Sequence, residues 1–228
     1  MEKQYISKKI EYIDLGTIDY KEAWELQQRT FELRTKNEID DILYLLEHPH
    51  TYTLGKVADK NNLITTDAVL KEKQISVYDI DRGGDITYHG PGQIVGYPII
   101  DLKNWKQDTH EYLRNLEEVI ISVCKDYGIE TERNPKYTGV WVGNRKIAAI
   151  GIKVSRWITM HGFAFNINTD LGLFDGIIPC GIKDKEVTSL SKELGRKIEL
   201  DEVKEKLLFH FIRLFDYTEK IENQKKGT

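Results

Sequence analysis

The chain has 228 residues, of which 40% are hydrophobic and 31% are charged, and its formal net charge is −4. This apolar content excludes a disordered chain, and the slightly acidic balance argues against a protein that coats nucleic acid. Two cysteines are too few for a disulfide scaffold or a four-cysteine zinc site. No apolar run reaches the roughly 18 residues of a membrane span, and the first residues lack the apolar core of a signal peptide. We therefore expect a cytoplasmic protein with reduced cysteines.

Hydrophobic periodicity predicts a mixture of helices and strands along the chain. In chain order, we expect a helix, three strands, a helix, a three-stranded meander and a last helix, over residues 19–35, 41–47, 75–80, 93–101, 108–127, 138–167 and about 201–216. The meander contains the turn Gly143-Asn144 between two apolar runs, which is typical of a hairpin. Strands joined by hairpins, with helices between groups of strands, favour an α+β class. No linker interrupts the chain, so we expect one domain over residues 1–222 and a polar tail over 223–228.

The segment from Arg82 to Gln93 is the densest in Gly, Pro and hydrogen-bond donors. Glycine lets the backbone approach a ligand closely, and Arg82, Thr87, His89 and Gln93 add donors to that frame. The segment therefore predicts either a ligand-binding loop or a tight structural loop between two strands. Its glycine spacing is GxGxxxG and it enters a strand, so a dinucleotide-binding fingerprint is a poor interpretation.

Cys180 lies between Pro179 and Gly181, which predicts a turn. A thiol on a turn is either a nucleophile, with nearby N–H groups as an oxyanion hole, or a packed structural thiol. Cys124, in contrast, falls in the middle of the helix predicted over 108–127 and is expected to be a core residue.

A nucleophilic cysteine needs a neighbour that favours its thiolate. Lys146 follows the predicted hairpin turn and begins a run of small residues, 147–151, that leaves room for a ligand; the alternative is a solvated turn lysine. The motif His48-Pro49-His50 is only a weak indication of a metal site, because Pro separates the histidines and no carboxylate or thiol lies nearby at a metal-ligand spacing. The small residues of His161-Gly162-Phe163-Ala164 again indicate a lined cleft. The full set of candidate partners is His48, His50, His89, His161, Lys146 and Lys153.

Five segments together resemble the lipoyl(octanoyl) transferase family. These are residues 82–98 (RGGDITYHGPGQIVGYP), 48–55 (HPHTYTLG), 146–151 (KIAAIG), 178–182 (IPCGI) and 187–190 (VTSL). They keep the order of the family and span roughly residues 40–195. One departure is Ala149, where many members carry Ser.

The resemblance implies a fold shared with biotin and lipoate protein ligases: a single domain with a mixed, mainly antiparallel sheet flanked by helices. It also implies a catalytic dyad of Cys180 and Lys146. The positions that match acyl-binding residues of the family are Arg82, Gly83, Gly84, Asp85, Ile86, Thr87, Tyr88, His89, Ala149, Ile150, Gly151, Gly162, Phe163 and Ala164.

The implied reaction moves an octanoyl or lipoyl group from acyl carrier protein to a lysine of lipoyl domains through a cysteine thioester. The expected acceptors are the lipoyl domains of 2-oxoacid dehydrogenases and the glycine cleavage H protein. The resemblance implies no ATP, metal or other cofactor, and neither nucleic acid nor a membrane as a partner. Three alternatives remain open: an ATP-dependent lipoate or biotin protein ligase on the same fold, a non-catalytic acyl- or carrier-binding module, and a thiol protease.

Charge is unevenly distributed along the chain. Residues 131–197 hold eleven Lys and Arg against six Asp and Glu, whereas the remainder holds 22 against 31. Because acyl carrier proteins are typically acidic, this basic segment is a candidate docking face. The alternative is a set of scattered surface lysines.

Overall fold

The computed structural model describes residues 8–178 and 186–223, and a large sheet forms the middle of the molecule. Its strands, within these residues, are β1 (Lys9–Thr17), β2 (Asp41–Glu47), β6 (Gln93–Ile99), β7 (Glu132–Arg133), β8 (Val140–Val142), β9 (Arg145–Ser155), β10 (Ile158–Asn166), β11 (Glu186–Val187) and β12 (Glu219–Asn223). They are ordered β12-β1-β2-β6-β10-β9-β8-β7, with β11 beside β9. Neighbours from β2 to β7 run antiparallel, whereas β1 is parallel to β2 and β12. The predicted mixed, mainly antiparallel sheet is confirmed.

A smaller sheet packs beside the large one. It consists of β4 (Ser76–Asp79), β3 (Thr51–Leu54) and β5 (Ile86–His89), in that order, and α2 (Asp67–Glu72) precedes β4. The segment 82–93, predicted as a loop, therefore contains a strand, β5, that pairs antiparallel with β3. Four residues between glycines are too few to show a period, so only the pairing with β3 reveals this strand.

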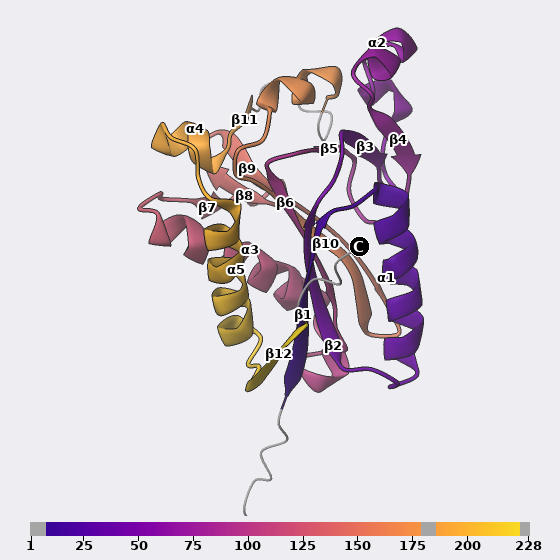
Figure 1. Ribbon diagram of the computed structural model, residues 1–228, viewed down its shortest axis with the longest axis vertical. Coiled ribbons are helices and arrows are strands. Elements are labelled where there is room, and N and C mark those ends of the chain that lie inside the picture. The colour runs from indigo at the N-terminus through magenta and orange to yellow at the C-terminus, as the bar shows by residue number, and fades with distance from the viewer. Residues whose placement is uncertain (1–7, 179–185, 224–228) are drawn as a thin grey trace, which may run out of the picture.

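Helices cover both faces of the large sheet (Figure 1). On one side lies α1 (Tyr20–Thr35), and on the other lie α3 (Thr109–Asp126) and α5 (Leu200–Leu214), with the short α4 (Leu190–Leu194) nearby. The helices predicted over 19–35, 108–127 and 201–216 are thus confirmed. Asp19 and Asp108 begin α1 and α3: the Asp19 side chain accepts from the Lys21 and Glu22 N–H groups, and that of Asp108 accepts from the Glu111 N–H.

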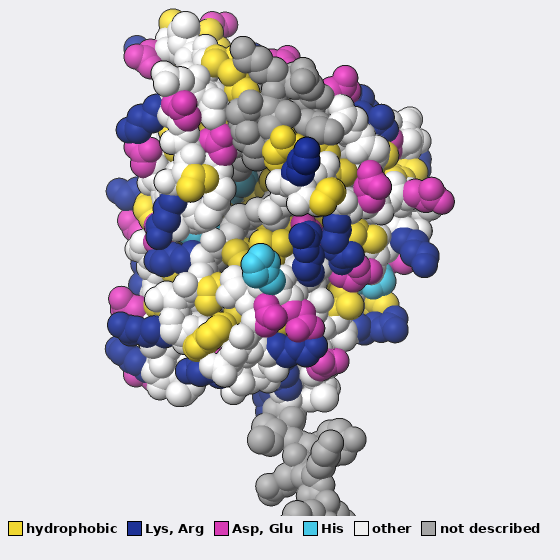
Figure 2. All heavy atoms as spheres, turned by 180° about the vertical axis from the view of Figure 1, so that it is seen from behind, with side chains coloured by type: hydrophobic (Ala, Val, Ile, Leu, Met, Phe, Trp, Pro, Cys, Tyr) yellow, Lys and Arg dark blue, Asp and Glu magenta, His cyan; other side chains and the backbone are white. Residues whose placement is uncertain are grey.

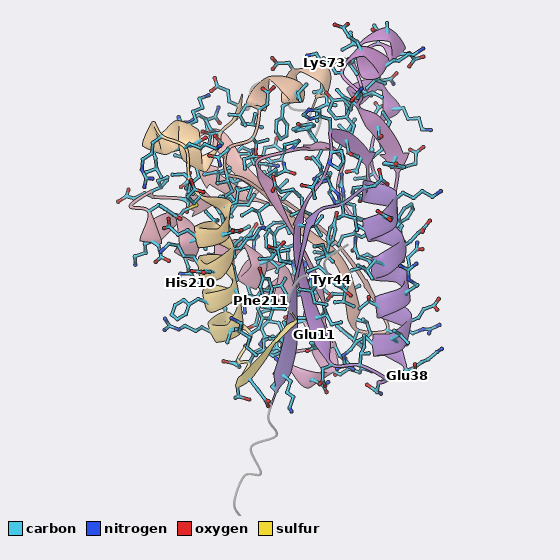
Figure 3. The ribbon with its side chains drawn as sticks, in the orientation of Figure 1. Glu11, Glu38, Tyr44, Lys73, His210 and Phe211 are labelled. Atoms are coloured by element: carbon cyan, nitrogen blue, oxygen red, sulfur yellow. The ribbon has the colours of Figure 1, made fainter. Side chains whose placement is uncertain are left out.

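The hydrophobic core occupies the layers between the sheet and its helices. Figure 3 labels Phe211 between α5 and the sheet, and Tyr44 between the sheet and α1. Cys124 is fully buried in the α3 layer, which confirms its assignment to the core. A third hydrophobic cluster, around Tyr52 and Tyr88, packs on the smaller sheet.

The predicted hairpin is present between β8 and β9. Gly143 adopts a φ of 55° there, in the left-handed region that glycine accepts without strain. At the other end of the chain, Asn223, predicted to begin the polar tail, is the last residue of β12, and residues 224–228 lie outside the described part. In the described ranges, no helix combines the length and the hydropathy that a bilayer crossing requires.

Candidate active site

A cavity of about 500 Å³ lies between the large sheet and the segment that carries β5. A recess is visible in the middle of the face shown in Figure 2, with hydrophobic and histidine side chains below the surface. Most of the site residues predicted from the sequence line this cavity: Lys146, Arg82, Gly83, Gly84, Asp85, Ile86, Thr87, His89, Ala149, Ile150, Gly151, Gly162, Phe163 and Ala164. The tertiary fold thus brings together residues 82–89, 146–151 and 162–164, which are far apart in the sequence.

Glycines allow the 82–84 segment to lie directly against β9. The Gly83 N–H donates to the Ile152 carbonyl at 2.9 Å, and a Cβ at Gly151 would lie only 2.9 Å from the Gly83 carbonyl oxygen. Such a contact is too close for any side chain at position 151, so glycine is required there. The small residues of β9, predicted to leave room for a ligand, therefore also allow the 82–84 segment to pack against that strand.

Arg82 fixes the inner side of this segment. Its guanidinium is buried and donates to the carbonyl and hydroxyl oxygens of Thr53, both at 2.9 Å, and to the Gly83 carbonyl at 3.0 Å. These bonds tie the segment to β3 as well as to β9. The cavity wall is consequently held from two sheets at once.

Asp81, just before the segment, joins it to β9 and β10. Its carboxylate accepts from His161 Nε2 at 2.8 Å and from Lys153 Nζ at 2.5 Å. The hydrogen bond from His161 holds the pKa of Asp81 well below its usual range, against burial and with help from Lys153. Burial lowers the pKa of His161, so we assign a neutral imidazole that donates from Nε2. His161 also has a left-handed backbone, with a φ of 57°, and a strained residue of this kind is often found at a functional site.

Tyr20, Tyr97 and His89 line the polar side of the cavity, and the buried His48 lies next to Tyr97. His48 donates from Nδ1 to the Ile18 carbonyl at 2.8 Å, so its Nε2 accepts from the Tyr97 hydroxyl at 2.7 Å. The ring of Tyr20 stacks on that of His89 at 5.7 Å, and Tyr20 and Tyr97 both line the cavity. Burial lowers the pKa of His48 to about 4 and that of His89 well below its ordinary value, so both rings are neutral at neutral pH.

The tautomer of His89 follows from its neighbours. Gln93 donates its amide to the Tyr88 carbonyl and to Asn166 Oδ1, so Gln93 Oε1 accepts from His89 Nδ1 at 2.9 Å. His89 Nε2 is then an acceptor, and the Thr53 hydroxyl lies 3.3 Å from it. Of the donors predicted for this segment, His89 and Gln93 therefore bond each other and Arg82 bonds Thr53 and Gly83, rather than all pointing to a ligand.

Lys146 lies near the start of β9, at the cavity. Its ammonium nitrogen is 4.8 Å from the centre of the Trp141 ring, and its carbonyl accepts from the Thr188 N–H at 2.9 Å. The interpretation of Lys146 as a solvated turn lysine is therefore not supported. Cys180 lies outside the described residues; Phe174 and Val187, which come before and after it in the sequence, both line the cavity.

Some predicted or possible site residues lie elsewhere. Tyr88 does not line the cavity; its hydroxyl is 2.8 Å from His50 Nδ1, within the core of the smaller sheet. His48 and His50 thus have separate hydrogen-bond partners, and the described residues contain no group of three or more His, Cys, Asp or Glu arranged to hold a metal ion.

Sequence reasoning missed several residues that line the cavity: Tyr20, Tyr97, Lys136, Tyr137 and Thr138. Tyr20 and Tyr97 occupy a helix and an apolar strand, where they read as ordinary core residues. Lys136 to Thr138 belong to the connection between β7 and β8, and no local signal places that connection at the cavity.

Comparison with known proteins gives a consistent result for the whole chain. The family model described as the lipoyl protein ligase A/B catalytic domain matches residues 19–212. A protein of Christiangramia forsetii named octanoyltransferase is 55% identical over 227 residues, covering 92% of this chain and 97% of the relative. Another octanoyltransferase, from Flavobacterium johnsoniae, is 51% identical over 228 residues, covering 92% and 98%. The crystal structure of a lipoate-protein ligase A bound with ATP has a similar fold, with a TM-score of 0.73 and 13% identity over 98% of this chain and 90% of that one.

Proposed function

This chain belongs to the lipoyl(octanoyl) transferase family of acyltransferases, built on the lipoyl protein ligase A/B catalytic domain, and from that premise we propose that it transfers octanoyl groups from acyl carrier protein to lipoyl-domain lysines. In the proposed reaction Cys180 carries the acyl group as a thioester, and Lys146 acts as the general acid and base. The observation that supports this best is the cavity beside Lys146, lined by the segments that carry the family motifs. Lipoyl transfer by the same route fits the same cavity.

The cavity suits a medium-length alkyl chain. Apolar or small side chains from three strands, among them Val95, Ile150 and Ala164, line it beside the polar groups. An octanoyl group has seven carbons beyond its carbonyl, and at about 0.8 kcal/mol per buried methylene its burial contributes roughly 5–6 kcal/mol. This energy is available to hold the acyl group while the carrier leaves and the acceptor arrives.

In the first proposed step, the Cys180 thiolate attacks the carbonyl carbon of the octanoyl thioester on the carrier. The bond from that carbon to the carrier sulfur breaks, and the carrier thiolate leaves with a proton from the Lys146 ammonium. Before the attack, the same ammonium favours the thiolate and so lowers the pKa of the Cys180 thiol. The products are the octanoyl-enzyme thioester, a neutral Lys146 and the free carrier thiol.

In the second proposed step, the neutral ε-amine of a lipoyl-domain lysine attacks the thioester. A carbon–nitrogen bond forms, the carbon–sulfur bond breaks, and Cys180 leaves as a thiolate. The proton lost by the attacking amine goes to neutral Lys146, which restores the starting charges. Both steps exchange an acyl group that is already activated, so the proposed cycle requires no ATP, metal or other cofactor.

Ion pairs within the protein affect which cations of residues 131–197 are available to an acidic carrier. Several cations of residues 131–197 face carboxylates within the protein: Arg145 pairs with Glu193 at 3.0 Å, and Lys153 pairs with Asp81. Lys136, in contrast, is exposed and lies at the cavity. We propose that carrier docking depends on Lys136 more than on the net charge of the segment. The lipoyl domains of 2-oxoacid dehydrogenases and the glycine cleavage H protein remain the proposed acceptors.

Intact-mass spectrometry tests the covalent intermediate. Wild type incubated with octanoyl-acyl carrier protein, without ATP, should gain the mass of one octanoyl group, and Cys180→Ser should not. Cys124→Ala is the matched control, because Cys124 is buried and its variant should acylate like wild type. A mass gain on Cys180→Ser contradicts the proposed nucleophile, and a strict requirement for ATP favours the ligase alternative.

A further inference from the structure

A buried carboxylate stands next to the candidate active site and has no role in the mechanism above. Glu117 is fully buried, and it is the only charged residue among the buried side chains of α3, a helix that the structure describes throughout. Burying a carboxylate is costly unless charges and hydrogen bonds compensate it. An apolar side chain would pack in this layer without that cost, so the contacts of Glu117 show what compensates its charge.

Those contacts reach both ends of one connecting loop. Glu117 Oε2 lies 3.2 Å from Arg133 Nε, just before residues 134–138, and Oε1 accepts from the Gly139 N–H at 3.0 Å, just after them. Arg114 Nη1, one turn earlier on α3, donates to Oε2 at 2.6 Å. A single side chain therefore fastens the entrance and the exit of the loop to α3.

The loop between these anchors is ordered by its own hydrogen bonds. Asn134 Oδ1 accepts from the backbone N–H groups of Lys136 and Tyr137, at 2.9 and 3.2 Å. Trp141 Nε1 donates to the Tyr137 carbonyl at 3.2 Å. The loop thus behaves as a unit whose position depends on its ends, and three of its residues, Lys136, Tyr137 and Thr138, line the cavity.

The exit of the loop contacts the Lys146 side chain. A Cβ at Gly139 would lie 3.4 Å from Lys146 Cε and 2.5 Å from the Ala148 carbonyl oxygen, so the Gly139 backbone is packed directly against β9. The Trp141 ring, two residues later, lies beneath the Lys146 ammonium at 4.8 Å. Glu117, through Gly139, therefore holds one wall of the space in which Lys146 lies.

We propose that Glu117 is a positioning residue for Lys146: its carboxylate fixes both ends of the 134–138 loop and thereby the place of the Lys146 ammonium at the cavity. The inference depends on the proposed role of Lys146 and adds a residue that contacts neither substrate nor thiol. Both oxygens take part, because Oε1 accepts from the Gly139 N–H at the exit of the loop and Oε2 faces Arg133 at its entrance.

Two substitutions affect the two anchors differently. Glu117→Asp keeps the charge but shortens the side chain by one methylene, so it cannot reach both anchors. Glu117→Gln keeps the length and one acceptor oxygen, but its amide NH2 is a donor, so only one end of the loop can remain fastened. Glu118→Asp is the matched control, because Glu118 pairs with Arg133 and has no contact with Gly139. All variants are made in a Cys124→Ala background, so that alkylation reports Cys180 alone.

The readouts are the pH profile of Cys180 alkylation by iodoacetamide and the rate of octanoyl-enzyme formation. We expect Glu117→Asp to raise the apparent pKa of the thiol and to slow acylation about tenfold, as for a misplaced catalytic group. Glu117→Gln should change both readouts in the same direction, because one anchor is lost, whereas Glu118→Asp should remain close to the Cys124→Ala parent. Thermal unfolding of each variant separates a loss of stability from a shift in the pH profile.

Three results would overturn the inference. The first is a Glu117→Asp protein that is less stable but has the parent pH profile and acylation rate. The second is Glu117→Gln with the parent pH profile and acylation rate, since fastening both ends of the loop would then be unnecessary. The third is a Glu118→Asp defect of equal size. A Lys146→Ala variant distinguishes failure of the proposed function from failure of this inference. If Lys146→Ala leaves the thiol pKa unchanged, the proposed role of Lys146 fails and this inference fails with it. If Lys146→Ala changes the thiol pKa but Glu117→Asp does not, only this inference fails.

Discussion

His48 gives a stability prediction that can be worked out in magnitude and sign. The ring is completely buried behind Tyr97, and burial lowers its pKa from 6.5 to about 4 in the folded protein. In the unfolded chain the ring titrates near 6.5. Between these two values the unfolded state binds more protons than the folded state, so stability falls as the pH falls from about 6.5 to about 4. Above this window the contribution is constant.

The size of the loss follows from the two pKa values. A difference of one unit corresponds to about 1.4 kcal/mol, so full titration of His48 costs about 3 kcal/mol of unfolding free energy. His48→Gln removes the titration and keeps an acceptor for the Tyr97 hydroxyl, but it leaves the Ile18 carbonyl without its donor. That loss destabilises the variant by about 1–2 kcal/mol at neutral pH. Near pH 4 the variant should therefore be as stable as wild type, or more stable.

Urea unfolding of both proteins, followed by circular dichroism at several pH values from about 7 to about 4, measures this difference directly. His89 and His161 are also buried and neutral, and both are present in the two proteins; the comparison therefore reports the titration of His48 together with its effect on the pKa of His89. A gap between wild type and His48→Gln that stays constant over the whole range would refute the reasoning.

Three further predictions concern the cavity and the buried charges. Ala149→Val adds two carbons to the cavity wall and so excludes about two methylenes of the acyl chain, at ~0.8 kcal/mol each. In a competition assay with octanoyl and hexanoyl carriers, octanoyl transfer should therefore fall about tenfold relative to hexanoyl transfer. Asp81→Asn removes a carboxylate whose pKa is lowered by the hydrogen bond from His161, so the variant should be less stable than wild type at neutral pH. The difference in unfolding free energy should close as the pH falls below about 4, and a difference that persists in acid would argue against this explanation. Tyr217→Phe removes the hydroxyl that donates to buried Asp41 at 2.7 Å, and a loss of about 1–3 kcal/mol is expected in denaturant unfolding, where no loss would show that the bond is dispensable.

The regular elements of the fold were largely predictable because their signals are local. The period of α3 and the turn at Gly143 depend on residues within a few positions of one another. The strands β1, β5 and β12 were not predicted, since each is defined by a partner far away in the sequence: β5 by β3, and β1 by β2 and β12. Pairing of this kind leaves little trace in a short run of residues.

The candidate site divides in the same way. The sequence by itself determined the family, the chemical types of Lys146 and Cys180, and the small residues that line the cavity. The small residues could be recognised because close packing of two backbones leaves room only for glycine or alanine. Only the tertiary structure decided that Tyr20 and Tyr97 share that cavity and that Glu117, on a core helix, reaches the loop beside Lys146. A buried carboxylate is identified by what compensates it, and here the compensating groups, Arg133 and Gly139, lie 16 and 22 residues away along the chain. Burial and its compensation are properties of the folded arrangement, so they could not be read from any single segment.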